Sequence, residues 1–217
     1  MNIVILGPQG SGKGTQSEMV AQKYDAEHFD TGKLLRQVSK SDTPLGKEIH
    51  EIVIEKKELV PSRILKEILH LRLNDLQREQ SIVFDGVPRN MEQASYFEEA
   101  LLEFGRKLDK VFFINISEKE SIKRISKRWI CQKCRKIMIM GKDIKKEKEA
   151  CPACGGEISQ RADDTPEGVK KRLHIYQEET LPVLDFFKKE NLLVEINGEQ
   201  LIEKVFEDII KVVEKND

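Results

Sequence analysis

A glycine-rich segment near the N-terminus contains the residue types that bind nucleotide phosphates. Gly7–Thr15 reads GPQGSGKGT, follows a short apolar run and opens a helical pattern at Lys13. Glycines let successive backbone N–H groups face an anion, and a helix N-terminus adds partial positive charge. Lys13 would add a full charge at the β and γ phosphates. This order of features predicts a phosphate loop, for which an ordinary glycine-rich turn is the alternative.

The residues after Lys13 predict how a magnesium ion would be held. Ser or Thr usually follows this lysine and binds Mg²⁺, whereas here Gly14 stands in that place and Thr15 comes one residue later. We therefore expect water and the nucleotide phosphates to hold most of the ion, which retains several waters readily. Asp85 ends an apolar run and could orient magnesium-bound water. Helix capping is the alternative role for this carboxylate.

Four cysteines form two pairs with the spacing of a structural zinc site. Cys131 and Cys134 are followed, after sixteen intervening residues, by Cys151 and Cys154. Two such pairs can supply four thiolates to a closed tetrahedral site, which would hold together a segment with little apolar core. Their clustering in one segment of a long chain argues against a disulfide scaffold. Redox-active pairs, unpaired thiols and iron on the same ligands are the alternatives.

Composition restricts the class of protein that carries these features. The chain has 217 residues, 39% hydrophobic and 35% charged, with 37 basic and 38 acidic side chains for a net charge of −1. These values predict one globular domain, with room for an insertion. The balanced charge argues against a general nucleic-acid binder. No apolar run approaches the ~20 residues of a membrane helix. The N-terminus lacks a basic leader, so we expect a cytoplasmic protein.

Alternating apolar runs and helical patterns predict an α/β fold. Near-continuous apolar runs indicate buried parallel strands at Asn2–Leu6, Ser81–Asp85, Val111–Ile116 and Leu192–Ile196. Helical patterns lie between and beyond them, at Lys13–Tyr24, Pro61–Gln80, Asn90–Phe104, Glu118–Trp129, 165–189 and Glu199–Glu214. The alternation predicts a three-layer fold with a central parallel sheet and right-handed crossovers.

Local signals refine this prediction. Ser117 and Glu120 have the spacing of a capping box, and Pro182 predicts a kink in helix 165–189. Two segments do not fit the alternation. Residues 31–60 are helical by pattern but follow no strong strand, and residues 130–163 contain the cysteines. Both are predicted to be excursions from the central sheet.

Four motifs, taken together and in order, resemble the adenylate kinase family. They are GPQGSGKGTQ at 7–16, DTGKLLR at 30–36, DGVPR at 85–89 followed by Gln93, and RADDTPEGVKKR at 161–172. The cysteine segment resembles the long-lid, zinc-containing bacterial form. The resemblance implies a P-loop core of residues 1–30, 61–126 and 165–217, a mononucleotide-binding arm for AMP at 31–60 and a zinc-containing lid at 127–164. It implies the reaction ATP + AMP ⇌ 2 ADP, with Mg²⁺ accompanying ATP and structural Zn²⁺ in the lid.

The resemblance also implies roles for individual residues. Those implied to bind AMP are Thr31, Arg36, Glu58, Leu59, Val60, Gly86, Val87, Pro88, Arg89, Gln93, Arg161 and Arg172. Those implied to bind ATP are Gly10, Ser11, Gly12, Lys13, Gly14, Thr15, Arg124, Arg128, Ile137, Met138 and Gln200. The catalytic set is Lys13, Asp85, Arg89, Arg124, Arg128, Arg161 and Arg172. The expected partners are ATP, AMP and ADP, without nucleic acid or membrane, and we expect a monomer.

The chain departs from the usual family pattern at several positions. Val87 replaces Phe, Asn90 replaces Thr, Lys33 replaces an acidic residue, Trp129 replaces an Arg, and Ile137 and Met138 stand where the lid usually ends in Tyr. Val87 and Lys33 leave UMP, CMP or GMP open as the acceptor. Gln93 favours AMP, because an amide can pair with the adenine edge through one donor and one acceptor.

The implied chemistry requires positive charge rather than a general base. The transferring phosphoryl group spreads negative charge over its oxygens, and the planar fork of arginine binds two of them. The acceptor phosphate, with a second pKa of about 6, is already ionised near neutral pH. The histidines are therefore predicted to be ordinary surface or core residues: His28, His50, His70 and His174.

Charged residues of the cysteine segment have competing interpretations. Asp163 and Asp164 could orient arginines or pair with a closing lid that excludes water, or they could stabilise the next helix N-terminus. A rival function is a nucleotide switch whose zinc ribbon binds nucleic acid. The net charge and the lack of aromatic residues near the cysteines, apart from Trp129, disfavour it. Solvated charges are predicted at Lys145, Lys146 and Lys148.

Overall fold

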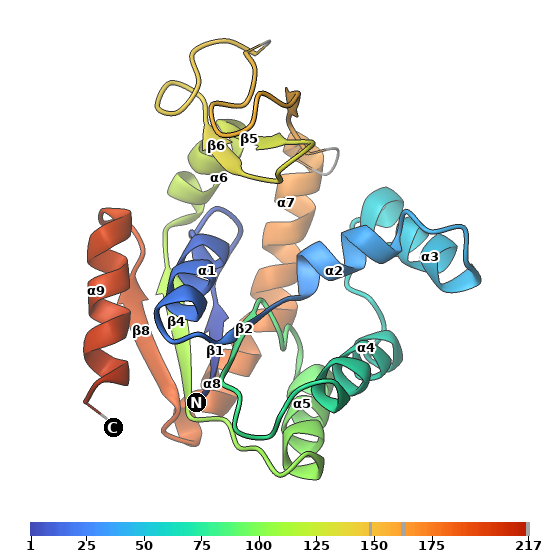
Figure 1. Cartoon of the computed structure of the whole chain (residues 1–217), viewed down its shortest axis with the longest axis vertical. Coiled ribbons are helices and arrows are strands. Elements are labelled where there is room, and N and C mark those ends of the chain that lie inside the picture. Colours follow the sequence, from blue (N-terminus) through green and yellow to red (C-terminus); the bar gives the residue numbers. More distant parts are fainter. Residues whose placement is uncertain (148, 162–163, 216–217) are drawn as a thin grey trace.

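The computed structural model describes residues 1–147, 149–161 and 164–215, and its centre is a parallel sheet (Figure 1). This main sheet has five strands in the spatial order β2 (Glu27–Asp30), β3 (Ile82–Asp85), β1 (Asn2–Leu6), β4 (Lys110–Asn115) and β8 (Leu193–Asn197). The predicted α/β fold around a central parallel sheet is confirmed. Within these ranges no helix is both long and apolar enough to cross a bilayer.

Apolar side chains on both faces of the main sheet produce the three layers. In β1, Ile3 and Ile5 pack on one face with α1 (Lys13–Lys23) and α9 (Ile202–Val213). Val4 and Leu6 pack on the other face, because successive side chains of a strand alternate. That second face is covered by α4 (Ser62–Asn74), α5 (Met91–Glu103) and α8 (Leu181–Lys189).

One strand of the main sheet was not predicted from the sequence. β2 reads EHFD, and Phe29 is its one fully buried residue. It pairs with β3 alone and therefore lies at the edge of the sheet. An edge strand with a single apolar residue has no apolar run, so the criterion that found the other four strands could not detect it.

Three predicted helices were too long or too regular. The helix expected over Pro61–Gln80 is α4, which ends at Asn74. α6 (Glu118–Ser126) ends before Trp129, because Arg128–Cys131 forms strand β5 instead. The helix expected over 165–189 is α7 (Pro166–Ile175), a π-helical turn η2 (Tyr176–Thr180) and α8. The irregularity therefore precedes Pro182, which has no N–H to donate to the carbonyl four residues earlier.

Residues 31–56 form a helical excursion from the main sheet. Its elements are α2 (Thr31–Val38), α3 (Pro44–Ile49) and the π-helical η1 (His50–Lys56). Asp30 caps α2 by accepting a hydrogen bond from the Lys33 N–H at 2.8 Å, and Thr43 caps α3 through the Gly46 N–H at 3.0 Å. In Figure 1, α2 and α3 project to the right of the main sheet, on the side opposite α9.

The cysteine segment forms the second excursion, a small antiparallel sheet at the top of Figure 1. Its strand order is β6 (Ile137–Ile139), β5 (Arg128–Cys131) and β7 (Ile158–Ser159). The small sheet has its own core, which two of the cysteines help to form: Cys131, Met138, Ile144, Cys151 and Ile158.

Candidate active site

A cavity of about 630 Å³ lies where the main sheet, the helical excursion and the small sheet meet. The carboxyl ends of β1, β2 and β3 border it, as expected for a ligand site in a parallel sheet. Most of the residues expected to bind nucleotide line this one cavity. They are Gly10, Ser11, Gly12, Lys13, Gly14, Thr15, Thr31, Arg36, Glu58, Leu59, Val60, Asp85, Gly86, Val87, Arg89, Gln93, Arg124, Arg128, Ile137, Arg161, Arg172 and Gln200.

The phosphate loop joins β1 to α1 and presents open N–H groups to the cavity. Gly12 is the N-cap of α1 with φ 90°, a left-handed conformation that favours glycine, and it has no side chain to cap the helix. The Ser11 hydroxyl accepts the Lys13 N–H in a long hydrogen bond of 3.4 Å. Gly10 also has positive φ, and a Cβ there would lie 3.1 Å from the Ser121 carbonyl oxygen. The uncapped first turn of α1 can therefore receive an anion.

Lys13 is surrounded by more positive than negative side chains, since Arg89, Arg128 and Arg161 lie near it but, among the described residues, only Asp85 opposes them. Its ammonium donates to the Pro8 carbonyl at 3.3 Å. Burial lowers the pKa of Lys13 to about 8; Asp85 opposes this shift, whereas nearby arginine charges reinforce it. Burial likewise lowers the pKa of Arg89. A polyanionic ligand would relieve both effects, because it supplies the missing negative charge.

Asp164 connects the small sheet to α7 through two arginines. Arg128 Nε and one of its terminal nitrogens donate to the Asp164 carboxylate at 2.9 and 2.6 Å, and Arg172 donates at 2.8 Å. The side chain of Asp164 is 0% exposed. Burial alone would raise its pKa, but the two guanidinium groups lower it. The arginines are thus held side by side at the cavity, one of the two roles expected for this aspartate.

The acceptor-side residues are fixed by their own hydrogen bonds. Gln93 Oε1 accepts the Arg89 N–H at 2.8 Å, and Arg89 Nε donates to the Gly86 carbonyl at 2.6 Å. Asn90, which replaces the usual Thr, caps α5 through the Gln93 N–H at 2.9 Å. Thr31 lines the cavity with a buried hydroxyl that has no hydrogen-bond partner among the described residues. A buried hydroxyl of this kind is available to a ligand.

Strand alternation decides which residues of β6 face the cavity. Ile137 lines it, but Met138 is 0% exposed and packs in the core of the small sheet. The expectation for Met138 is therefore corrected, since Ile139 occupies the cavity-facing position two residues after Ile137. Pro88, which follows a cis peptide bond, is likewise absent from the cavity wall.

Other expected residues have structural surroundings that their motifs did not reveal. Glu58 lines the cavity, but its carboxylate pairs with Lys171 at 3.0 Å. Gln200 lines the cavity while its side chain donates to Asp208 at 2.8 Å, which leaves its backbone for a ligand. Lys33 and Trp129 are not part of the wall. Asp163 and Lys148 lie outside the described residues. The motifs also missed wall residues beyond them, including Lys57, Lys142, Asp143, Tyr176 and Thr180.

The four cysteines converge as their spacing predicted. The Sγ atoms of Cys131 and Cys154 are 3.5 Å apart, and those of Cys134 and Cys151 are 3.7 Å apart. All four sulfurs lie within 4.8 Å of one another. A tetrahedral site with Zn–S bonds of about 2.3 Å places its sulfurs about 3.8 Å apart, so this group fits zinc. Within the cluster, the Cys134 N–H lowers the pKa of the Cys131 thiol, whereas the neighbouring thiols raise the pKa of Cys134. The convergence of the four sulfurs, rather than these pKa shifts, therefore supports a metal site.

A second group of ligand atoms lies beside the phosphate loop. His28, Asp30 and Asp85 come from the ends of β2 and β3, with ligand atoms within 4.8 Å of one another. His28 Nε2 is 3.7 Å from Asp85 Oδ2. Burial would lower the pKa of His28, but the nearby Asp85 carboxylate raises it. Because β2 was not predicted, sequence analysis could not bring His28 to this site.

Comparisons with known proteins agree with this geometry. A family model described as Adenylate kinase matches residues 5–192. Adenylate kinases of Archaeoglobus fulgidus and Methanothrix thermoacetophila are 37% and 38% identical to this chain over 215 residues, covering 99% of it and 99% of each relative. The adenylate kinase of Bacillus cytotoxicus is 38% identical over 209 residues, 96% of either chain. The chain therefore belongs to the adenylate kinase family.

Proposed function

We propose that the cavity transfers the γ-phosphoryl group of ATP to AMP and that the residues lining it divide into a donor end and an acceptor end. The observation that carries this proposal is the convergence of Lys13 and six arginines on one cavity. The arginines are Arg36, Arg89, Arg124, Arg128, Arg161 and Arg172. Two nucleotides bring several negative charges together, and fixed guanidinium groups offset them.

At the donor end, the phosphate loop would bind the phosphates of ATP. The uncapped N-terminus of α1 and Lys13 supply hydrogen bonds and charge for the β and γ groups. The base would bind between two parts of the cavity wall. One part is formed by Ile137 and Ile139, and the other by Gly198 and the Gln200 backbone. Aliphatic side chains can cover an aromatic base, although they do not stack on it as Tyr does.

At the acceptor end, residues 31–60, which comprise the helical excursion and the four residues after it, would act as the AMP-binding arm. Arg36 and Arg89 would bind the monophosphate, and the Thr31 hydroxyl is available to a ligand. Gln93 keeps its amide in one orientation through the Arg89 N–H, so its NH₂ group can donate to an adenine ring nitrogen. These contacts support AMP as the acceptor.

The transfer step needs no proton carrier. A phosphate oxygen of AMP attacks the γ-phosphorus, the bond from that phosphorus to the β–γ bridging oxygen breaks, and ADP forms on both sides. Lys13, Arg128, Arg161 and Arg172 would stabilise the charge on the transferring group. Asp164 contributes by holding Arg128 and Arg172 in place. Positioning and fixed charge thus account for the chemistry.

Two metal ions fit the residues present. Asp85 and Thr15 would hold Mg²⁺ through water; a Cβ on Gly14 would lie 3.2 Å from Asp85 Oδ2, so glycine lets that carboxylate approach α1. When bound, Mg²⁺ offsets phosphate charge. The four cysteines would hold Zn²⁺ as a structural ion, with no open position for substrate.

Residues 127–164 would then act as a lid over the P-loop core of 1–30, 61–126 and 165–217. Closure would exclude water, the competing acceptor, and complete the arginine shell. Because one cavity holds both ends, we infer that a monomer suffices. Four thiols that serve a metal also suit a reducing cytoplasm.

The test is an acceptor panel. Purified protein is mixed with Mg-ATP and separately with AMP, UMP, CMP or GMP, and the diphosphates are separated by chromatography. We expect AMP to be converted rapidly and two ADP to form per AMP consumed. Preferential conversion of another monophosphate would overturn the acceptor assignment, and ATP hydrolysis without diphosphate transfer in every tube would overturn the kinase mechanism.

A further inference from the structure

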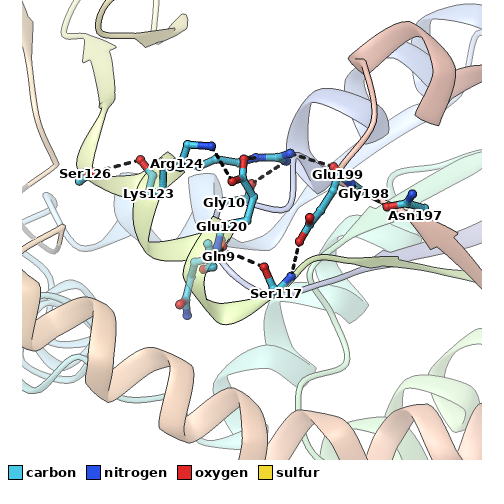
Figure 2. A network of polar contacts seen from close by, with 11 residues as sticks. Gln9, Gly10, Ser117, Glu120, Lys123, Arg124, Ser126, Asn197, Gly198 and Glu199 are labelled. Atoms are coloured by element: carbon cyan, nitrogen blue, oxygen red, sulfur yellow. Dashed lines mark hydrogen bonds and ion pairs between the residues drawn. The ribbon is translucent and has the colours of Figure 1, made fainter.

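Three hydrogen bonds hold the chain after β8 against two helices, and Figure 2 shows the two that reach α6. Arg124 of α6 donates to the Gly198 carbonyl at 3.0 Å. The Glu199 carboxylate accepts the Ser117 N–H at 2.8 Å. Farther along, Gln16 of α1 donates to the Ile202 carbonyl at 2.9 Å. The loop contains Gly198 and Gln200, which line the donor end of the cavity, so these attachments fix the wall against which a base would lie.

The attachment through Glu199 replaces half of a capping box. Ser117 Oγ accepts the Glu120 N–H at 3.3 Å, which is the usual first half of that motif. In the second half, the Glu120 carboxylate normally accepts the N–H of the capping residue. Here Glu199, 82 residues away in the chain, takes that N–H. A local motif of α6 has therefore become a long-range contact between α6 and the loop.

The replacement frees Glu120 to hold an arginine of the site. The Glu120 carboxylate accepts Arg124 Nε at 2.9 Å and also pairs with Lys123 at 2.8 Å. Arg124 thereby contacts both the loop after β8 and the phosphate loop, since it donates to the Gly198 and Gly10 carbonyls at 3.0 and 3.4 Å. Figure 2 shows Arg124 extended between Gly10 and Gly198, with Glu199 reaching down to Ser117.

We propose that Glu199 is a positioning residue for the donor nucleotide, which sets the base-binding wall by docking the 197–200 loop onto the N-terminus of α6. Glu199 does not line the cavity and acts through Gly198 and Gln200. Its carboxylate accepts a charge-assisted hydrogen bond at a helix N-terminus, where negative charge is favoured. The inference rests on the proposed function in one respect only, that ATP binds at this end.

The first test removes the Glu199 carboxylate and measures KM separately for ATP and for AMP. Glu199→Ala should raise KM for ATP about fivefold, the cost of one hydrogen bond, and leave kcat and KM for AMP within about twofold. Glu199→Gln retains an acceptor oxygen and should restore most of the affinity. Glu195→Ala is the matched control, because Glu195 is an exposed acid near the loop that bonds to Asn115 instead. Equal changes in both KM values, or none, would overturn the proposal.

A second test removes the other side of the same contact. Ser117 has φ −67°, which proline adopts, so Ser117→Pro deletes the N–H without requiring a new backbone angle. Ser117→Ala, which loses the hydroxyl but keeps the N–H, is its control. Ser117→Pro should raise KM for ATP more than Ser117→Ala does, and it should add little in the Glu199→Ala background. Fully additive effects would contradict a shared contact.

Calorimetric titration with ATP alone separates this proposal from the proposed function. The dissociation constant should rise about fivefold in Glu199→Ala, in parallel with KM. This measurement does not involve the acceptor. Wild-type protein that binds ATP but fails to phosphorylate AMP would overturn the proposed function, whereas unchanged ATP affinity in the variant would overturn the role of Glu199.

Discussion

The main sheet and the small sheet contribute to the same cavity, but they are stabilised differently. The main sheet packs continuous apolar residues on both faces, with α1 and α9 on one side and α4, α5 and α8 on the other. The small sheet has a core of five buried residues, and two of these are cysteines. Apolar burial alone can hold the first in place, whereas so small a core needs an additional crosslink.

This difference divides the site into a preformed half and a conditional half. The phosphate loop, Lys13 and Arg89 are positioned by the main sheet. Arg128 belongs to the small sheet, and its ion pair with Asp164 holds its guanidinium group at the site. We therefore expect the donor phosphates to bind at preformed groups, and we expect the arginines around the transferred phosphoryl group to depend on the proposed metal at the four cysteines.

The largest effect should come from removing that metal. Protein stripped with a thiol-competitive chelator and returned to Mg²⁺ should lose activity by about 10³-fold, because the small sheet supplies Arg128 and, in the proposed mechanism, helps to exclude water. Calorimetry should show the main-sheet transition preserved. Adding Zn²⁺ back should restore activity. A stripped enzyme with half of its activity left would show that the small sheet is as self-sufficient as the main sheet.

The next effect concerns the bridge between the two halves. Asp164→Ala should lower kcat about 10²-fold and reduce the free energy of unfolding by roughly 3 kcal/mol, because two guanidinium groups lose a fully buried partner. Steady-state kinetics and urea unfolding measure these quantities. Asp164→Asn, which keeps the shape but not the charge, should lie between wild type and Asp164→Ala. Activity within threefold of wild type in the Ala variant would mean that the arginines are held independently.

A smaller, graded effect should come from the titration of Lys13. Because its pKa in the free enzyme is about 8, kcat/KM for ATP should fall as pH rises above that value, by at most about tenfold per pH unit. The free energy of unfolding should rise between pH 8 and 10.5, because in this range the unfolded chain keeps the Lys13 proton and the folded chain loses it. Lys13→Arg, which stays charged, should abolish the decline. A flat wild-type profile to pH 10 would contradict this assignment.

The smallest effect separates the two faces of β6. Ile139→Ala should raise KM for ATP about fivefold through lost apolar contact, and it should leave thermal stability nearly unchanged. Met138→Ala should do the reverse, because Met138 is fully buried in the small core. Calorimetric melting and ATP kinetics of the pair decide the matter. If Met138→Ala alone weakened ATP binding, the strand would face the cavity in the opposite sense.

Sequence patterns predicted the features that depend on local chemistry. The phosphate loop, the paired cysteines and four of the main-sheet strands each have a continuous signature of apolar, glycine or thiol positions. β2 was missed because an edge strand with one buried residue lacks such a signature. The overlong helix at 118–129 failed because pairing of Arg128 with Ile139 competes with helix propensity, and helical periodicity does not report that partner.

Long-range polar contacts were the least predictable part of the site. The spacing of Ser117 and Glu120 correctly marked the start of α6, but nothing local indicates that Glu199 takes one half of the motif. Likewise, His28 reaches Asp85 only because β2 and β3 are neighbours in the sheet. Such contacts depend on strand order and loop docking, which a pattern along the chain does not contain.

The most direct test of the central claim follows the transferred group itself. ATP labelled in its γ-phosphoryl group is mixed with unlabelled AMP, Mg²⁺ and protein, and the label is located after one turnover. We predict that it appears in ADP and that inorganic phosphate stays unlabelled, because the closed cavity excludes water. Label released as inorganic phosphate, or retained in ATP, would contradict phosphoryl transfer between two nucleotides in this cavity.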